Sequence, residues 1–173
     1  MKFLLWLLSF FPKPMPPITP DPIPEPTSEP VTSSTKDTLY AVSKSLIGKH
    51  LTLNQLVDQR LGCAQALSYV LKQVKWTSIP KHGIDGTAGL LEWFEGHPEM
   101  YEEIFEYQQG AIALAVTGTG NSKIRGHTAV CGYNCMMSNN SQSGLWDTHW
   151  DWERWYQYYD VFGGFKTRFF ILK

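Results

Sequence analysis

The sequence predicts an α+β fold in which N-terminal helices pack on a small antiparallel sheet. Apolar residues recur at helical spacing in the first half of the globular part, for example at Leu67, Val70 and Leu71. Short apolar or alternating segments bounded by turn residues follow in the second half, as in 111–116 and 126–133. Helices followed by strands, rather than alternating with them, are typical of an α+β arrangement.

Residues 1–11 differ in composition from the rest of the chain. The run 3–11 is almost entirely apolar, but it is shorter than the roughly 20 residues that a membrane-spanning helix needs. It has the length of a signal-peptide core or a shallow membrane anchor, and no small-residue cleavage site follows it. We therefore expect an uncleaved anchor or weak export signal that contacts a membrane. The alternative is a disordered hydrophobic tag or an oligomerisation patch.

Residues 12–37 are predicted to be a linker. Prolines recur at nearly every second position up to Pro30, and Ser and Thr dominate after it. Because proline fixes φ and lacks an N–H donor, this segment is predicted to be a stiff extended spacer rather than a helix or interior strand. The remaining residues, 38–173, are sufficient for one globular domain with its own core. This organisation predicts a domain that is membrane-associated or exported.

The net charge and the cysteine content argue against a nucleic-acid-binding protein, a zinc site and a disulfide scaffold. The net charge is −1, which gives no indication of nucleic-acid binding. The three cysteines, Cys63, Cys131 and Cys135, have neither zinc-site spacing nor the density of a disulfide scaffold. Since their number is odd, at least one thiol stays free within a monomer, as a nucleophile requires. Cys131 lies among apolar strand residues and is expected to be buried.

Cys63 is the candidate nucleophile. It follows Gly62 at the start of a predicted amphipathic helix, where the first backbone N–H groups lack helical partners. These groups and the positive end of the helix dipole favour a thiolate over a thiol. The same groups can hold an oxyanion. The alternative interpretation is a plain buried cysteine.

His127 is the candidate general base. It lies on a predicted strand that pairs with the next strand through a turn near Asn134, so it faces residues 139–141. Side chains alternate between the faces of a strand, so only one of Asn139 and Asn140 can share the face of His127. We expect Asn139, with Asn140 as the choice if the register slips by one residue. That asparagine would accept the imidazole N–H and fix its tautomer; the alternative is a simple polar turn.

Two further groups are predicted to be structural. Asp147, His149 and Asp151 alternate like metal ligands, but they lack a fourth partner at suitable spacing and are explained by one polar face. We expect no metal and no cofactor. The aromatic residues near the C-terminus are expected to pack in the core and its rim, with one or two lining a groove. They are Trp146, Trp150, Trp152, Trp155, Tyr156, Tyr158 and Tyr159.

Three motifs together resemble the CHAP and NlpC-type cysteine peptidases, above all the single-domain forms of phages and bacteria. They are Gly62-Cys63-Ala64 before an amphipathic helix, Gly126-His127-Thr128-Ala129-Val130 on a strand, and Met137-Ser138-Asn139-Asn140-Ser141 with Gly144-Leu145-Trp146 and Trp155 behind it. The resemblance extends from about Leu39 to Leu172. It implies a papain-like fold and hydrolysis of amide bonds in peptidoglycan.

The resemblance also implies roles for individual residues. Cys63 would be the nucleophile, with its backbone N–H as one oxyanion donor, His127 the general base and then acid, and Asn139 the orienting residue. The implied enzyme is an amidase or endopeptidase that works through an acyl-enzyme on the peptide stem or cross-bridge, at the cell wall or periplasm, and is compatible with a phage-encoded origin. The proline spacer and the lack of a wall-binding repeat depart from the family pattern.

Two other functions stay open at this point. One is a catalytically silent module on the same fold that binds the cell wall or a partner. The other is a cysteine hydrolase or acyltransferase that acts on a protein substrate.

Overall fold

The computed structural model describes residues 35–54, 56–58, 61–74 and 78–173. The chain divides into two units, 1–30 and 31–173, and the described ranges belong to the second. The predicted apolar segment 1–11 and the predicted linker up to residue 34 therefore lie outside the described residues, and both stay predictions. Within the described ranges, no helix has the length and apolar character that crossing a membrane requires.

The described part of the chain confirms the α+β prediction. Three helices come first: α1 (Thr35–Ser45), α2 (Cys63–Gln73) and α3 (Gly86–Gly96). The strands of one antiparallel sheet follow, in the spatial order β1-β6-β2-β3-β4-β5. Their bounds are β1 Tyr101–Ile104, β2 Ile112–Ala115, β3 His127–Cys131, β4 Met136–Asn139, β5 Trp146–Trp150 and β6 Arg168–Leu172.

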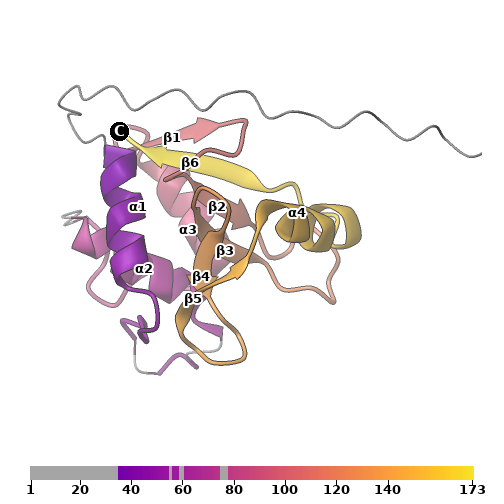
Figure 1. Ribbon diagram of the computed structural model, residues 1–173, viewed down its shortest axis with the longest axis horizontal. Helices are drawn as coiled ribbons and strands as arrows, with labels where there is room; N and C mark the ends of the chain where they lie inside the picture. Colours follow the sequence, from indigo (N-terminus) through magenta and orange to yellow (C-terminus); the bar gives the residue numbers. More distant parts are fainter. Residues whose placement is uncertain (1–34, 55, 59–60, 75–77) are drawn as a thin grey trace, which may run out of the picture. The chain divides into compact units, whose positions relative to one another are not determined.

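Helices α1, α2 and α3 cover one face of the sheet (Figure 1). The apolar side of α2, including Leu67 and Leu71, is completely buried against this face, together with Val130 of β3 and Met137 of β4. Each such buried aliphatic side chain contributes roughly 1.5–3 kcal/mol of apolar burial. This packing fixes the first turn of α2 against the start of β3.

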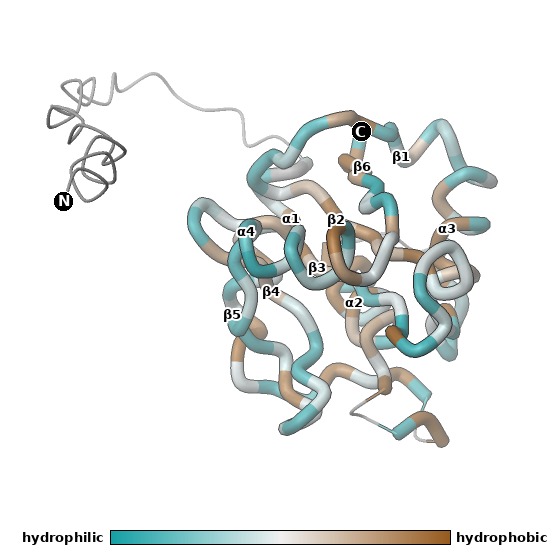
Figure 2. Tube along the Cα trace, turned by 90° about the vertical axis from the view of Figure 1, so that its right-hand side faces the viewer, coloured by the Kyte–Doolittle hydropathy of each residue, from teal (hydrophilic) through white to brown (hydrophobic). Residues whose placement is uncertain are grey.

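The other face of the sheet carries a second, smaller core. It is covered by the short helix α4 (Trp152–Trp155), which continues directly into the π-helix η2 (Tyr156–Phe162). Because side chains alternate along β3, Ala129 and Cys131 point to this second core while Val130 points to the first. The apolar strand β2 runs through the middle of the folded part, between the two cores (Figure 2).

The hairpin of β3 and β4 turns where the sequence predicts, and β5 is the strand that sequence reasoning missed. Val130 pairs with Met137 and Cys131 with Met136, which places the turn around Asn134. β5 is the last strand of the sheet, and only Trp146 among its side chains is fully buried. Because an edge strand buries few side chains, its polar residues resemble a loop in the sequence.

Candidate active site

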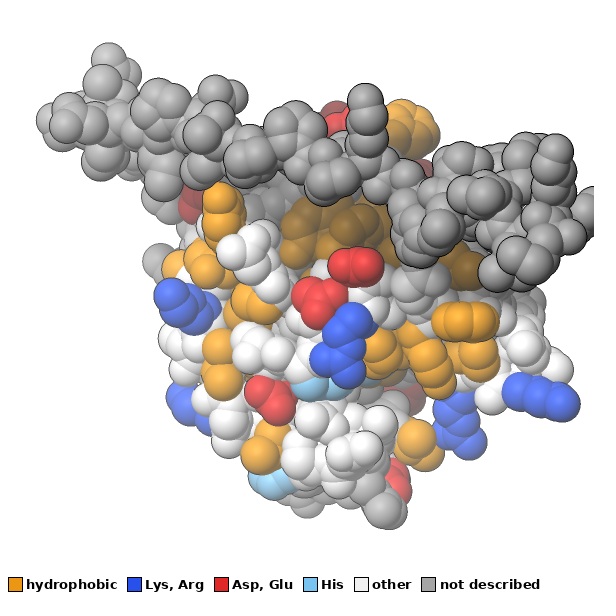
Figure 3. Space-filling view, turned by 45° about the vertical axis from the view of Figure 1, so that its right-hand side comes forward, with side chains coloured by type: hydrophobic (Ala, Val, Ile, Leu, Met, Phe, Trp, Pro, Cys, Tyr) orange, Lys and Arg blue, Asp and Glu red, His pale blue; other side chains and the backbone are white. Residues whose placement is uncertain are grey.

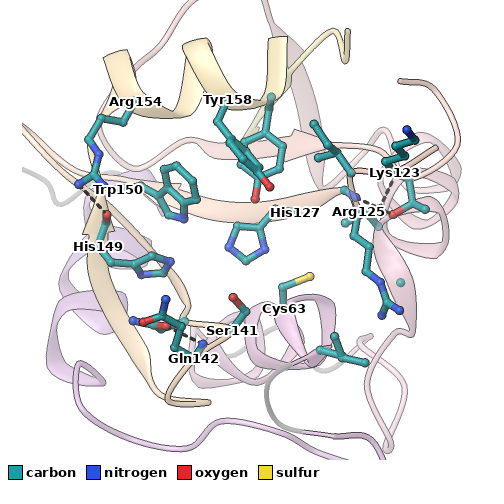
Figure 4. A pocket seen from close by; sticks show the side chains of 18 residues that line it. Cys63, Lys123, Arg125, His127, Ser141, Gln142, His149, Trp150, Arg154 and Tyr158 are labelled. Carbon is teal, nitrogen blue, oxygen red and sulfur yellow. Dashed lines mark hydrogen bonds between the residues drawn. The ribbon is translucent and has the colours of Figure 1, made fainter. Parts of the chain in front are cut away.

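Cys63 and His127 line the same cavity, which measures about 850 Å³. The cavity lies where the first turn of α2 meets the start of β3. Figure 4 shows the two side chains beside each other, with Trp150 and Tyr158 above His127 in this view and Ser141 and Gln142 below it. The packing of α2 on the sheet thus brings together two residues that are far apart in the sequence.

Cys63 is the first residue of α2. Gly62 precedes it and accepts the hydrogen bond from the backbone N–H of Ala66 that starts the helix, at 2.7 Å. The sulfur lies near the backbone N–H groups of Cys63 itself, Ala64 and Thr128, all of which hydrogen-bond to it. Two of these donors belong to the open end of the helix and the third to the residue after His127. The side chain is partly exposed, and its exposed side faces the cavity.

The structure corrects the expectation that Cys63 favours a thiolate. Burial raises the pKa of the Cys63 thiol to about 11, and the three backbone N–H groups only partly offset this effect. Removing the thiolate charge from water therefore costs more than the hydrogen bonds from these N–H groups return. In the substrate-free protein, Cys63 is therefore a neutral thiol at physiological pH.

His127 is the first residue of β3 and is buried. Its Nε2 lies 3.1 Å from Oγ of Ser138 on the neighbouring strand β4. When Nε2 carries the ring proton and donates it to Ser138, Nδ1 is left unprotonated and can take a proton from a group in the cavity. Ser138 is fully buried, so its hydroxyl is held in place by the sheet.

Two aromatic rings of the second core fix the plane of the His127 ring. Trp155 of α4 stacks on it at 5.6 Å between centroids, and Tyr159 of η2 lies at 5.9 Å with an interplanar angle of 19°. Burial, with a smaller contribution from the nearby His149, lowers the pKa of His127 to about 3. His127 is therefore neutral at rest, as a general base must be.

The structure does not bring Asn139 to His127. Asn139 pairs with Trp146 of β5, which packs in the first core under α1 and α2, so its side chain is on the opposite face of the sheet from His127. Ser138 occupies the position that was predicted for Asn139. Asn140, the register-slip alternative, lines the cavity but does not contact the imidazole nitrogen that Ser138 holds. The prediction was wrong because it placed Asn139, and not Ser138, on the face of β4 that contacts His127.

The remaining predictions for this region concern metal ligands and aromatic residues. Among the described residues, no group of three or more His, Cys, Asp and Glu side chains is arranged to hold a metal ion. Asp147 instead contacts the Asn140 amide, and Asp151 caps α4 by accepting from the backbone N–H of Arg154. Trp150, Tyr158 and Tyr159 line the cavity, while Trp146 and Trp155 are core residues.

Sequence reasoning missed the role of Ser138, and it named Trp155 and Tyr159 as packing residues without predicting that they stack on His127. A serine on a buried strand has no distinguishing pattern, and the stacking depends on a π-helix that apolar periodicity does not reveal.

Comparisons with protein-family models, with curated proteins and with solved structures found no match to this chain.

Proposed function

We propose that this chain is a papain-like cysteine hydrolase of the CHAP or NlpC type that cleaves amide bonds in peptidoglycan peptides. The observation that carries the proposal is the shared cavity of Cys63 and His127, with the far nitrogen of His127 held by Ser138. A thiol at a helix start, an imidazole beside it and a third group that orients the imidazole are the parts of nucleophilic acyl transfer. The roles of Cys63 and His127 follow the sequence resemblance, and Ser138 takes the orienting role in place of Asn139.

The proposed reaction starts from a neutral thiol and a neutral imidazole. His127 Nδ1 takes the thiol proton as Sγ of Cys63 attacks the carbonyl carbon, so no ion pair has to exist beforehand. The carbonyl electron pair moves to oxygen, and the backbone N–H groups around the sulfur are the nearest donors to this oxyanion. The imidazolium then donates its proton to the leaving amine as the C–N bond breaks, and a thioester remains on Cys63.

The second half of the reaction releases the acid. His127, neutral again, takes a proton from water, and the hydroxide formed attacks the thioester carbon. The C–S bond breaks and the sulfur recovers its proton from His127. Every step uses side chains and backbone groups of this chain, and a cavity of about 850 Å³ fits a peptide of a few residues.

The test is mass spectrometry of purified cell-wall sacculi after incubation with the full chain, with Cys63→Ala, and with Cys135→Ala. Cys135 is a second free, partly exposed cysteine that does not line the cavity, so it is the matched control. We expect new amino or carboxyl ends from the wild type and Cys135→Ala but not from Cys63→Ala. Their identity would distinguish an amidase from an endopeptidase.

One observation favours a second candidate, a silent module that binds the wall without cleaving it. The raised pKa of Cys63 makes the resting thiol a weak nucleophile. No release from several wall types, together with no covalent adduct on Cys63 after incubation with a peptidyl chloromethyl ketone, would overturn the hydrolase and leave this module. Release that persists in Cys63→Ala would overturn the role of Cys63.

A further inference from the structure

The cavity around Cys63 and His127 is lined by basic but not acidic side chains. Lys123, Arg125 and Arg154 contribute to its wall, and none of the described lining residues is Asp or Glu. The whole chain has 16 acidic and 15 Lys or Arg residues, so its composition does not explain this bias. On the face drawn in Figure 3, basic, acidic and apolar side chains are mixed, in contrast to the cavity lining.

The three cations lie on two sides of the reacting pair. In Figure 4, Arg154 is on one side with Trp150 and His149, Lys123 and Arg125 are on the other, and Cys63 and His127 lie between them. A substrate whose amide carbon reaches Cys63 would therefore have a cation near each of its two halves.

Local contacts hold the two segments of the chain that carry these cations. Arg154 donates a long hydrogen bond of 3.5 Å to the His149 carbonyl, and its guanidinium is 6.0 Å from the centre of the Trp150 ring. On the other side, the turn before β3 is closed by the Lys123 N–H to the Asn121 side chain at 3.0 Å. The same segment is tied to Thr117 through the Gly126 N–H, also at 3.0 Å.

These cations lack carboxylate partners within the described residues. The ion pairs found there join Arg168 to Glu95 and Glu103, at the opposite edge of the sheet. His127 and Cys63 are both neutral at rest, so neither of these two groups offsets the positive charge. Cations of one sign in a cleft raise the local concentration of anions and attract anionic substrates.

We propose that this cavity selects peptides that carry a free carboxylate on each side of the scissile amide, with Arg154 binding one carboxylate and Arg125, assisted by Lys123, binding the other. This inference rests on the proposed function and narrows its substrate. Guanidinium groups bind carboxylates through paired N–H donors, which neutral carboxamides do not match. Stem peptides with free carboxyl groups are therefore substrates, and amidated stem peptides are discriminated against.

The test measures binding separately from cleavage. Isothermal titration calorimetry with full-chain Cys63→Ala compares L-alanyl-γ-D-glutamyl-L-lysyl-D-alanine with the same peptide amidated at the glutamyl α-carboxyl, at the C-terminus, or at both. We expect the diacid to bind at least tenfold more tightly than the diamide. We expect this ratio to fall as NaCl increases, because salt screens exposed charges.

Substitutions assign each carboxylate to a side of the cavity. Arg125→Gln and Arg154→Gln, each combined with Cys63→Ala, should each lose sensitivity to amidation at one end of the peptide and keep it at the other. Lys166→Gln, which removes an exposed lysine outside the cavity, is the matched control and should leave all affinities unchanged.

These experiments test the carboxylate selection independently of the proposed hydrolase activity. Equal affinity for diacid and diamide, or no binding of either, overturns the carboxylate selection even if the wild type cleaves cell walls. A preference for the diacid, with each arginine variant losing sensitivity to amidation at one end only, supports it even if no wall is cleaved and the hydrolase proposal fails; a preference that both arginine variants keep at both ends overturns it.

Discussion

At the scale of single residues, the site depends on two groups that burial keeps neutral. A helix end and three backbone N–H donors act on Cys63, yet burial of the sulfur dominates and raises its pKa. The same effect acts in the opposite direction on His127, because burial disfavours the charged form of each group. Ser138, a neutral partner, does not stabilise an imidazolium as a carboxylate would. In the proposed reaction, these residues therefore favour proton transfer during attack over a permanent ion pair.

Ser138→Ala removes the group that holds Nε2 of His127 at 3.1 Å. If the proposed mechanism operates, we expect kcat to fall about 10- to 100-fold, the usual effect of losing an orienting partner, with little change in KM. Steady-state kinetics on a soluble stem peptide measures both constants. Ser143→Ala, in an exposed turn outside the cavity, is the matched control. A loss of the same size in Asn139→Ala but not in Ser138→Ala would restore the residue that the sequence predicts.

The depressed pKa of His127 predicts that stability is lost in mild acid. Above pH 6.5 the imidazole is neutral in both the folded and the unfolded chain, so its contribution is fully present. As the pH falls from 6.5 toward 3, the unfolded chain takes up a proton that the folded one resists. We expect about 2–3 kcal/mol of unfolding free energy to be lost by pH 4.5.

Urea unfolding at pH 7.0, 5.5 and 4.5 measures this loss, and variants isolate the part due to His127. His127→Gln should flatten the slope relative to wild type, whereas His82→Gln, at an exposed position, should not. Equal slopes in all three proteins would show that His127 titrates normally.

At the scale of elements, α4 and η2 connect the site to the rest of the sheet. Trp155 stacks on His127 and donates from Nε1 to the Thr167 hydroxyl at 2.9 Å. Thr167 in turn donates to the Asp160 carboxylate at 2.6 Å, and Asp160 also accepts from the Thr167 N–H. The imidazole plane is therefore set by a chain of contacts that ends beside β6.

Thr167→Val keeps the shape of the side chain but removes the hydroxyl between Trp155 and Asp160. We expect a loss of about 1–3 kcal/mol in unfolding free energy, because Trp155 Nε1 is left without its partner. If the proposed mechanism operates, kcat also falls, since the ring that orients His127 is released. Urea denaturation and steady-state kinetics measure the two effects. An unchanged kcat would show that Trp155 is held by packing alone.

At the scale of the whole molecule, the sequence predicted the arrangement better than it predicted the contacts. Apolar periodicity and the turn near Asn134 were enough to predict α2 and the β3–β4 hairpin, but they gave only the local settings of Cys63 and His127; that the two meet in one cavity depends on the packing of α2 on the sheet. The identity of the third residue depends on strand parity, which a shift of one position reverses. Which side chains of β4 point to which face of the sheet is determined by the residues that fill the two cores. The sequence of one hairpin does not show how these cores are filled.

Arg168, the first residue of β6, and Thr167, directly before it, extend this reasoning to the whole fold. Thr167 contacts Trp155 of α4, whereas Arg168 contacts Glu95 of α3 at 2.7 Å and Glu103 of β1 at 2.6 Å. The Arg168 guanidinium and its partners are partly exposed to solvent, so the pairs contribute modestly despite their good geometry. They connect β6 to β1 and α3, away from the cavity.

We expect Arg168→Gln to lower the unfolding free energy by about 1 kcal/mol or less, with a smaller effect at high salt, and to leave kcat and KM unchanged. Measured beside Thr167→Val, it separates the contacts of two adjacent residues: Arg168→Gln acts on stability alone, and Thr167→Val on stability and catalysis together. A fall in kcat in Arg168→Gln equal to that in Thr167→Val would contradict this separation. The activity would then depend on the stability of the sheet as a whole and not on the orientation of His127.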